Sequence, residues 1–144
     1  MSRLTPRCIP RAVARRWALA SVAACLALEA AVAFACDPAL DLATLAIRWS
    51  FLLIPLSPAL IAAGSRNPLC AIPAAASVAG WIVFALQAEC LRAGPAGTAA
   101  TAYYAVWFYG FISAALLALL AGPVLRAVGV RVGGRDGNTP PSQA

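Results

Sequence analysis

The sequence predicts an all-α integral membrane protein, an antiparallel bundle of about four transmembrane helices joined by short loops. Of its 144 residues, 62% are hydrophobic and only 11% are charged, whereas a soluble domain is usually about half apolar and a quarter charged. The apolar residues also fall in runs of roughly the 20 residues that a helix needs to cross a bilayer. So few charges cannot cover the surface of a water-soluble globule, and the lipid bilayer is therefore the first expected partner.

Turn-forming residues separate the four apolar runs. Asp37-Pro38 lies between the first and second runs, and the stretch Gly64–Asn67 lies between the second and third. Both are typical of turns. A further short loop at residues 92–97 precedes the fourth run. Loops this short leave no room for a globular domain outside the bilayer. The predicted transmembrane domain covers residues 17–125, with spans at about 17–35, 42–63, 68–88 and 99–125.

Charged residues lie mainly outside the runs and predict an orientation. Residues 1–16 form a basic N-terminus, and residues 126–144 form a basic tail, rich in Gly, Pro and polar residues, that is expected to be disordered. With four spans, both ends and the turn at residues 65–67 lie on one side, and positive residues favour the cytoplasm. The sequence therefore predicts a multi-pass protein with N-in and C-in topology. The arginines on that side are Arg3, Arg7, Arg11, Arg15, Arg16, Arg66, Arg126, Arg131 and Arg135.

The composition also indicates a cell type and excludes one partner. All eleven basic residues are Arg, and Ala is abundant, which indicates GC-rich coding and a bacterial inner (plasma) membrane. The net charge of +6 would suit nucleic acid, but a nucleic-acid-binding domain carries its charge on a polar body, often with aromatic platforms. Neither is present, so no nucleic-acid partner is expected.

The first 35 residues have an alternative interpretation as a secretory signal peptide. A basic segment, an apolar stretch over Trp17–Leu28, and Ala33-Phe34-Ala35 before Cys36 fit that pattern. A retained helix is favoured, because the apolar run is long enough for a full span. After cleavage, the mature chain would have three spans and an external N-terminus.

Two ionisable residues fall inside the predicted spans. A charge at the centre of a membrane helix costs roughly 2.5–3.5 kcal/mol on insertion scales, so such residues are candidates for function. Glu29 lies about seven residues before Cys36, and Arg48 about six residues after Leu42, which places them at similar depth, about 10 Å from the outer boundary. They could form an ion pair between neighbouring helices. In the alternative, Arg48 extends independently to the headgroups.

Further polar and aromatic residues cluster at the outer ends of the third and fourth runs. Gln87 and Glu89 end the third run, and Tyr103, Tyr104 and Trp107 open the fourth. Aromatic residues at this level usually form an interfacial belt. The alternative is an outward-facing polar cavity that they share with Glu29 and Arg48.

The sequence contains five cysteines and no histidine. Cys36 and Cys90 end the first and third runs, at the outer surface, where an oxidising compartment would allow a disulfide. In the alternative they are two small buried apolar residues. Without histidine or a Cys-x-x-Cys motif, the chain lacks the usual zinc, haem and thiol-redox ligands, and neither a metal nor a cofactor is expected.

The fourth run carries small residues at every fourth position. This spacing places them on one helix face, where they let a neighbouring helix approach closely. The predicted helix-packing stripe consists of Gly110, Ala114, Ala118 and Gly122.

The sequence does not predict an enzyme, because no set of nucleophile, base and acid can be assembled. The leading hypothesis is a small polytopic protein of the bacterial cell envelope that contacts other membrane protein subunits, or itself, through its helices. Its role would be that of an accessory subunit, assembly factor, regulator or immunity-type protein. The alternative is a small homo-oligomeric proton- or cation-coupled transporter or channel that uses Glu29. A transporter would need Glu29 to titrate and to face water, and an accessory protein would not.

Overall fold

Four long helices dominate the computed structural model, which describes residues 7–87, 90 and 97–133. They are α1 (Arg11–Cys36), α2 (Leu42–Gly64), α3 (Ala71–Leu86), preceded by the 3₁₀ turn η1 (Pro68–Cys70), and α4 (Gly97–Ala127). The described residues contain four helical segments long and apolar enough to span a membrane, at Arg11–Cys36, Leu42–Gly64, Pro68–Ala85 and Tyr104–Ala127. The prediction of a helical bundle is confirmed at this level.

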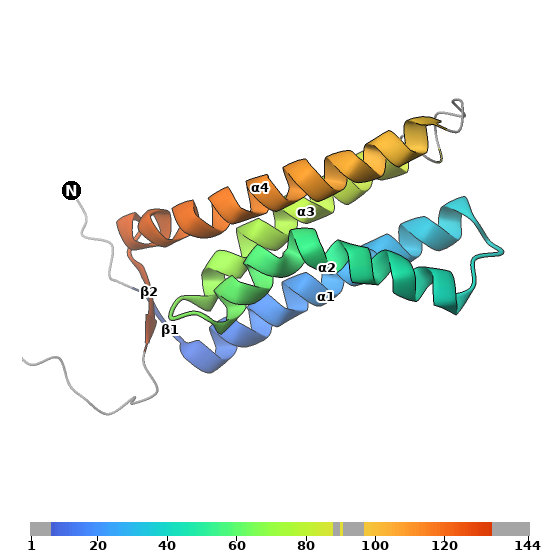
Figure 1. Ribbon diagram of the computed structural model, residues 1–144. Coiled ribbons are helices and arrows are strands. Elements are labelled where there is room, and N and C mark those ends of the chain that lie inside the picture. The colour runs from blue at the N-terminus through green and yellow to red at the C-terminus, as the bar shows by residue number, and fades with distance from the viewer. Residues whose placement is uncertain (1–6, 88–89, 91–96, 134–144) are drawn as a thin grey trace, which may run out of the picture.

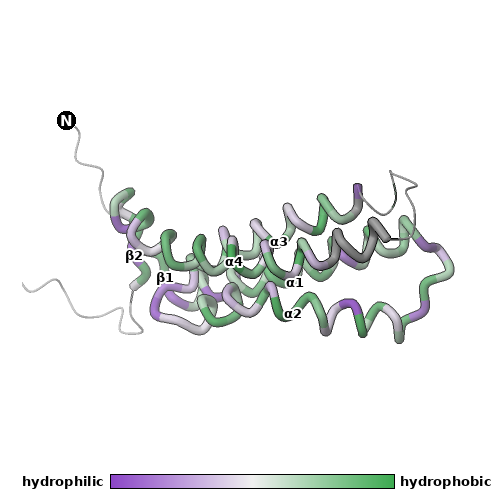
Figure 2. The backbone as a smooth tube through the Cα atoms, turned by 45° about the horizontal axis from the view of Figure 1, so that its top comes forward, coloured by the Kyte–Doolittle hydropathy of each residue, from purple (hydrophilic) through white to green (hydrophobic). Residues whose placement is uncertain are grey.

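The helices lie side by side, and the two ends of the bundle differ (Figure 1). One end, called here the loop end, carries the connection from α1 to α2. The opposite end, the strand end, carries the turn from α2 to η1 and two short strands, β1 (Arg7–Pro10) and β2 (Val130–Gly133). Hydrophilic segments gather mainly at these two ends, and hydrophobic segments dominate between them (Figure 2).

Two short strands accompany the helices, and the sequence did not predict them. β1 and β2 pair in parallel, with Arg7 opposite Val130 and Pro10 opposite Gly133. Parallel strands need a long connection, and here the whole helical bundle supplies it. The strands meet because both flanks of the bundle leave it at the same end. Gly129, with φ +81°, ends α4 in the left-handed conformation that glycine adopts readily and directs the chain into β2.

The helix and strand ends differ from the predicted borders of the terminal segments. α1 begins at Arg11 instead of Trp17, directly after Pro10 ends β1. Arginine is a good helix former, so the basic flank extends the helix. Residues 130–133, expected to be disordered, are ordered as β2. The remainder of the predicted tail, residues 134–144, lies outside the described residues.

Local hydrogen bonds explain how α2 begins and how it accommodates one of its two prolines, Pro58. Asp41 caps the helix by accepting a 2.9 Å hydrogen bond from the Thr44 backbone N–H. Pro58, inside the helix, has no N–H to donate to the Ile54 carbonyl one turn earlier. The Ser57 hydroxyl donates to that carbonyl instead, at 2.7 Å. The freed backbone group is thereby satisfied within the helix, as an apolar environment requires.

The core lies around α2 and α3, each of which contacts all three of the other helices. Half of the Pro68–Ala85 window is buried, against 11% of the Tyr104–Ala127 window. Small residues such as Ala71, Ala74 and Ala75 in α3 are fully buried and let the helices approach closely. The outer surface of α4 is therefore largely apolar and uncovered.

The predicted packing stripe of α4 faces the other helices over part of its length. Gly110 and Ala114 are buried, and Ala118 packs against the core. A Cβ added at Gly110 would lie 3.5 Å from the Pro55 Cβ, and one added at Gly122 would lie 3.9 Å from the Cys70 Sγ. The stripe therefore meets α2, α3 and η1 within this one chain.

Candidate functional site: an ion pair beside an apolar cavity

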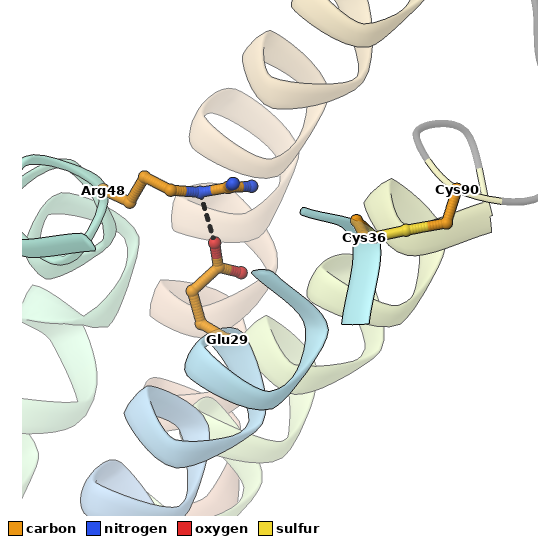
Figure 3. Close-up of a disulfide and its surroundings, with 4 residues drawn as sticks. All are labelled: Glu29, Cys36, Arg48 and Cys90. Atoms are coloured by element: carbon orange, nitrogen blue, oxygen red, sulfur yellow. Dashed lines mark hydrogen bonds and ion pairs between the residues drawn. A yellow bond between two sulfur atoms is a disulfide. The ribbon is translucent and has the colours of Figure 1, made fainter. Parts of the chain in front are cut away.

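An ion pair joins α1 to α2 in the half of the bundle nearer the loop end. Arg48 Nε donates to Glu29 Oε1 at 3.0 Å, and the two side chains are 19% and 7% exposed, respectively. Figure 3 shows the Glu29 carboxylate reaching from α1 towards the Arg48 side chain of α2. Of the two interpretations of Arg48, the structure has the ion pair. Each charge therefore compensates the other where water is scarce.

The helical spacing explains why Glu29 faces inward. Cys25, Val32 and Ala33 lie three or four residues from Glu29 and are also buried. Residues at these spacings share a helix face, so the face of α1 that packs on the bundle carries the carboxylate. Removing Arg48 would take a cation away from this carboxylate, which is costly in a poorly hydrated environment.

The ion pair forms part of the wall of a cavity of about 520 Å³. This volume falls in the range of small-molecule sites, roughly 300–1,000 Å³. Most of the wall is apolar, and the Phe51 and Trp107 rings meet in it with centroids 5.1 Å apart. The cavity is lined by Glu29, Thr44, Ile47, Arg48, Phe51, Leu52, Ile82, Ala85, Tyr104, Val106 and Trp107.

Some of the predicted polar and aromatic residues lie together around the cavity, and one of them lies outside it. Tyr104 and Trp107 line the same cavity as Glu29 and Arg48. Gln87 is exposed at the end of α3 and does not line it. Glu89 and the side chain of Tyr103 lie outside the described residues. Most of the residues that line the cavity come from α2 and α4.

The contribution of α2 to the cavity was missed in the sequence, although a signal for it exists. Thr44, Ile47, Arg48 and Phe51 follow the spacing i, i+3, i+4 and i+7, which defines one face of a helix. Once Arg48 turns towards Glu29, its face-sharing neighbours must turn the same way.

A disulfide lies close to the ion pair. Cys36, at the end of α1, is bonded to Cys90, with a Cα–Cα distance of 5.4 Å, inside the usual limit of about 7 Å. Figure 3 shows the disulfide and the ion pair in the same region. The disulfide ties the end of α1 to the chain beyond α3 and so limits the separation of the helices beside the cavity.

The other described cysteines have different environments. Cys8 is exposed in β1, whereas Cys25 and Cys70 are buried. The Cys25 thiol donates to the Ala75 carbonyl at 3.1 Å and so joins α1 to α3. Within the described part of the chain, no three His, Cys, Asp or Glu residues gather in a metal-binding arrangement.

The loop end also carries a carboxylate with a perturbed pKa. Hydrogen bonds from the Thr44 hydroxyl and backbone N–H hold the pKa of the Asp41 carboxyl below its usual range. Asp41 is fully exposed, so it acts as a helix cap at the surface and lies outside the cavity wall.

These features define a helical bundle whose four long apolar helices suit a multi-pass membrane protein, with an internal ion pair beside a lateral cavity. No family model, curated protein or solved structure matches the chain.

Proposed function

We propose that this chain is a multi-pass protein of the bacterial inner membrane that works through helix–helix contacts, as an accessory subunit, assembly factor, regulator or immunity-type protein. One observation carries the proposal: the Glu29 carboxylate is buried and ion-paired with Arg48. A proton- or cation-coupled transporter needs a carboxylate that exchanges its counter-ion with water. A carboxylate held by an arginine of the neighbouring helix instead suits a role in which the polar pair fixes two helices together.

The surface of α4 supports contacts with other membrane proteins. Large apolar side chains project from it over several turns, including Phe108, Leu116, Leu119 and Leu120, which are 53–73% exposed. A protein that exposed an apolar patch of this length to water would aggregate. In a bilayer it is covered by lipid or by the helix of a partner, and both suit the proposal.

The charge distribution supports four antiparallel spans with both termini in the cytoplasm. At the strand end lie Arg11, Arg15, Arg16, Arg66, Arg126 and Arg131. The acids among the described residues, Glu29, Asp37 and Asp41, all lie in the half nearer the loop end. Arginine-rich segments stay in the cytoplasm, so the loop end and the Cys36–Cys90 disulfide face the oxidising side.

The test is native mass spectrometry of the protein, extracted gently from its own membranes. We expect a complex that contains at least one different protein, and an intact subunit mass that includes residues 1–35 and lacks the two hydrogens of the disulfide. A homo-oligomer without other proteins would contradict the accessory role. A mass that starts after residue 35 would contradict the four-span topology and favour the cleaved signal peptide.

A second candidate function, a small homo-oligomeric proton- or cation-coupled transporter or channel, is favoured by the cavity beside Glu29. It predicts that purified protein in liposomes carries a proton or cation flux that Glu29→Gln abolishes. Thr44→Val, a change in the same wall that keeps the carboxylate, would leave the flux largely intact. If wild-type liposomes show no flux above protein-free liposomes, this candidate is eliminated.

A further inference from the structure

At the strand end a groove of about 480 Å³ opens between the start of α1 and the end of α2. Three arginines near the start of α1 form most of the polar wall of the groove. Arg11 and Arg15 are four residues apart and so lie one above the other on the helix, and Arg16 lies beside them. The groove is lined by Arg11, Ala12, Arg15, Arg16 and Leu19 of α1 and by Ala63 and Gly64 of α2.

The groove has a low wall on the side of α2. A Cβ added at Gly64 would meet nothing within 4 Å, and Ala63 contributes only a methyl group. The Arg11 Nη2 donates to the Ser65 carbonyl at 3.1 Å and so ties α1 to the turn after α2. This bond holds the two walls together, while Arg15 and Arg16 remain exposed.

The charge of the groove is not balanced by the described part of the chain. The acids described there, Glu29, Asp37 and Asp41, lie in the other half of the bundle. The Ala62 carbonyl, at the end of α2, already accepts hydrogen bonds from the Ser65 N–H at 3.1 Å and the Ser65 hydroxyl at 2.7 Å. The groove therefore attracts an anion.

The chemistry of the groove changes along α1. Leu19 is 46% exposed and lies one turn beyond Arg15 and Arg16, towards the apolar middle of the bundle. An ion that is polar on all sides would gain nothing from this leucine. A ligand with a phosphate at one end and a hydrocarbon chain at the other matches both parts of the groove.

We propose that this groove binds an anionic phospholipid, with its phosphate on Arg15 and Arg16 and an acyl chain along Leu19. Arginine suits this role because its planar guanidinium pairs with phosphate oxygens bidentately, and basic pockets between membrane helices favour anionic headgroups. The inference rests on the membrane location proposed above. It adds a lipid ligand that would anchor the α1–α2 pair at the strand end.

The experiment is native mass spectrometry of the full-length protein in mild detergent, titrated with phosphatidylglycerol or phosphatidylcholine of matched chains. We expect wild-type protein to retain phosphatidylglycerol in preference to phosphatidylcholine. The double variant R15Q/R16Q should bind phosphatidylglycerol about tenfold more weakly or worse, because each arginine near a lipid surface contributes about 1 kcal/mol. The control R126Q/R131Q removes the same charge at the same end, outside the groove, and should keep the preference.

Four results would overturn the proposal. Equal loss in both double variants would show diffuse charge attraction without a site. Equal retention of the two lipids by wild-type protein would show that no anion site exists, while leaving the membrane location intact. Displacement of the lipid by glycerol phosphate at equal concentration would show that the groove binds a free phosphate ester. A protein that stays soluble without detergent and binds neither lipid would refute the membrane location as well.

Discussion

Individual residues matter most where charge meets the apolar interior, at Glu29 and Arg48. Their 3.0 Å contact turns two costly charges into a mutually compensated pair. In proteins, removing one partner of a buried pair is often more damaging than removing both. The contribution of the pair is therefore measured by comparing single and double variants.

We expect Arg48→Gln to lower the stability of the protein by up to about 3–5 kcal/mol, and Glu29→Gln/Arg48→Gln to lower it less. The single variant removes the cation that lies 3.0 Å from the buried Glu29 carboxylate, whereas the double variant leaves two neutral amides. Thermal unfolding in detergent, followed by circular dichroism, measures the difference. Strictly additive losses in the two single variants and the double variant would show that the side chains are not coupled.

Asp41 gives the structure a dependence on pH. Its pKa is lower in the folded protein, because Thr44 donates hydrogen bonds to the carboxylate, than the value of about 3.9 in an unfolded chain. The stabilisation is therefore complete above the unfolded pKa and is lost as the pH falls through the folded pKa. Melting temperatures measured from pH 6 to pH 3 should fall more for wild-type protein than for Asp41→Asn.

Thr44→Val supplies the matched control for this titration, because it removes the hydroxyl donor and keeps the backbone N–H. We expect it to reduce the pH dependence without abolishing it. If wild-type protein and both variants lost stability in parallel on acidification, Asp41 would have no role in the pH response.

Among the elements, α2 shows how a hydroxyl can replace a missing backbone donor. Ser57 donates to the Ile54 carbonyl that Pro58 leaves free, whereas Ser50 donates at 2.8 Å to the Ala46 carbonyl. The Ala46 carbonyl lies in a stretch of regular helix and already accepts a hydrogen bond from a backbone N–H. The two hydroxyl groups therefore make the same type of bond with different consequences.

The Ile54 carbonyl lies on the outer face of α2, where the proposed bilayer would supply no water to replace the hydroxyl. We expect Ser57→Ala to destabilise the protein by about 1–3 kcal/mol, the cost of a polar group left unsatisfied away from water, and Ser50→Ala to have little effect. Unfolding of both variants in detergent, side by side, checks the prediction. Equal effects of the two substitutions would show that the Ile54 carbonyl finds another donor and that Ser57 is dispensable in the kinked helix.

For the whole molecule, the Cys36–Cys90 disulfide closes a long covalent loop. The two cysteines are 54 residues apart in the chain. A loop of this length constrains the unfolded chain by about 4 kcal/mol at most. We expect reduction, or Cys36→Ala/Cys90→Ala, to lower the melting temperature in detergent, and Cys8→Ala to leave it unchanged.

The same cysteines test the orientation of the bundle. With both termini in the cytoplasm, a membrane-impermeant maleimide added to intact cells should label neither Cys8 nor the disulfide-bonded pair. Cys8, which is exposed, should react once the membrane is opened, and Cys36 and Cys90 only after reduction. Labelling of Cys8 in intact cells would reverse the proposed topology.

Several features of this protein followed from the sequence by itself. The number and apolarity of the four helices, the turn at Asp37-Pro38 and the position of the candidates Glu29 and Arg48 within the apolar runs are local properties of neighbouring residues. Helix formation depends on residues within a turn or two, and so it can be read along the chain.

Only the tertiary structure decided which of these residues meet. The sequence allowed Arg48 either to pair with Glu29 or to extend alone, and it allowed Cys36 and Cys90 to remain apart. It also predicted disorder for residues 130–133, which pair with Arg7–Pro10 as a strand. The physical reason is that the rotation of each helix about its axis, and the meeting of segments far apart in the chain, are set by packing between helices.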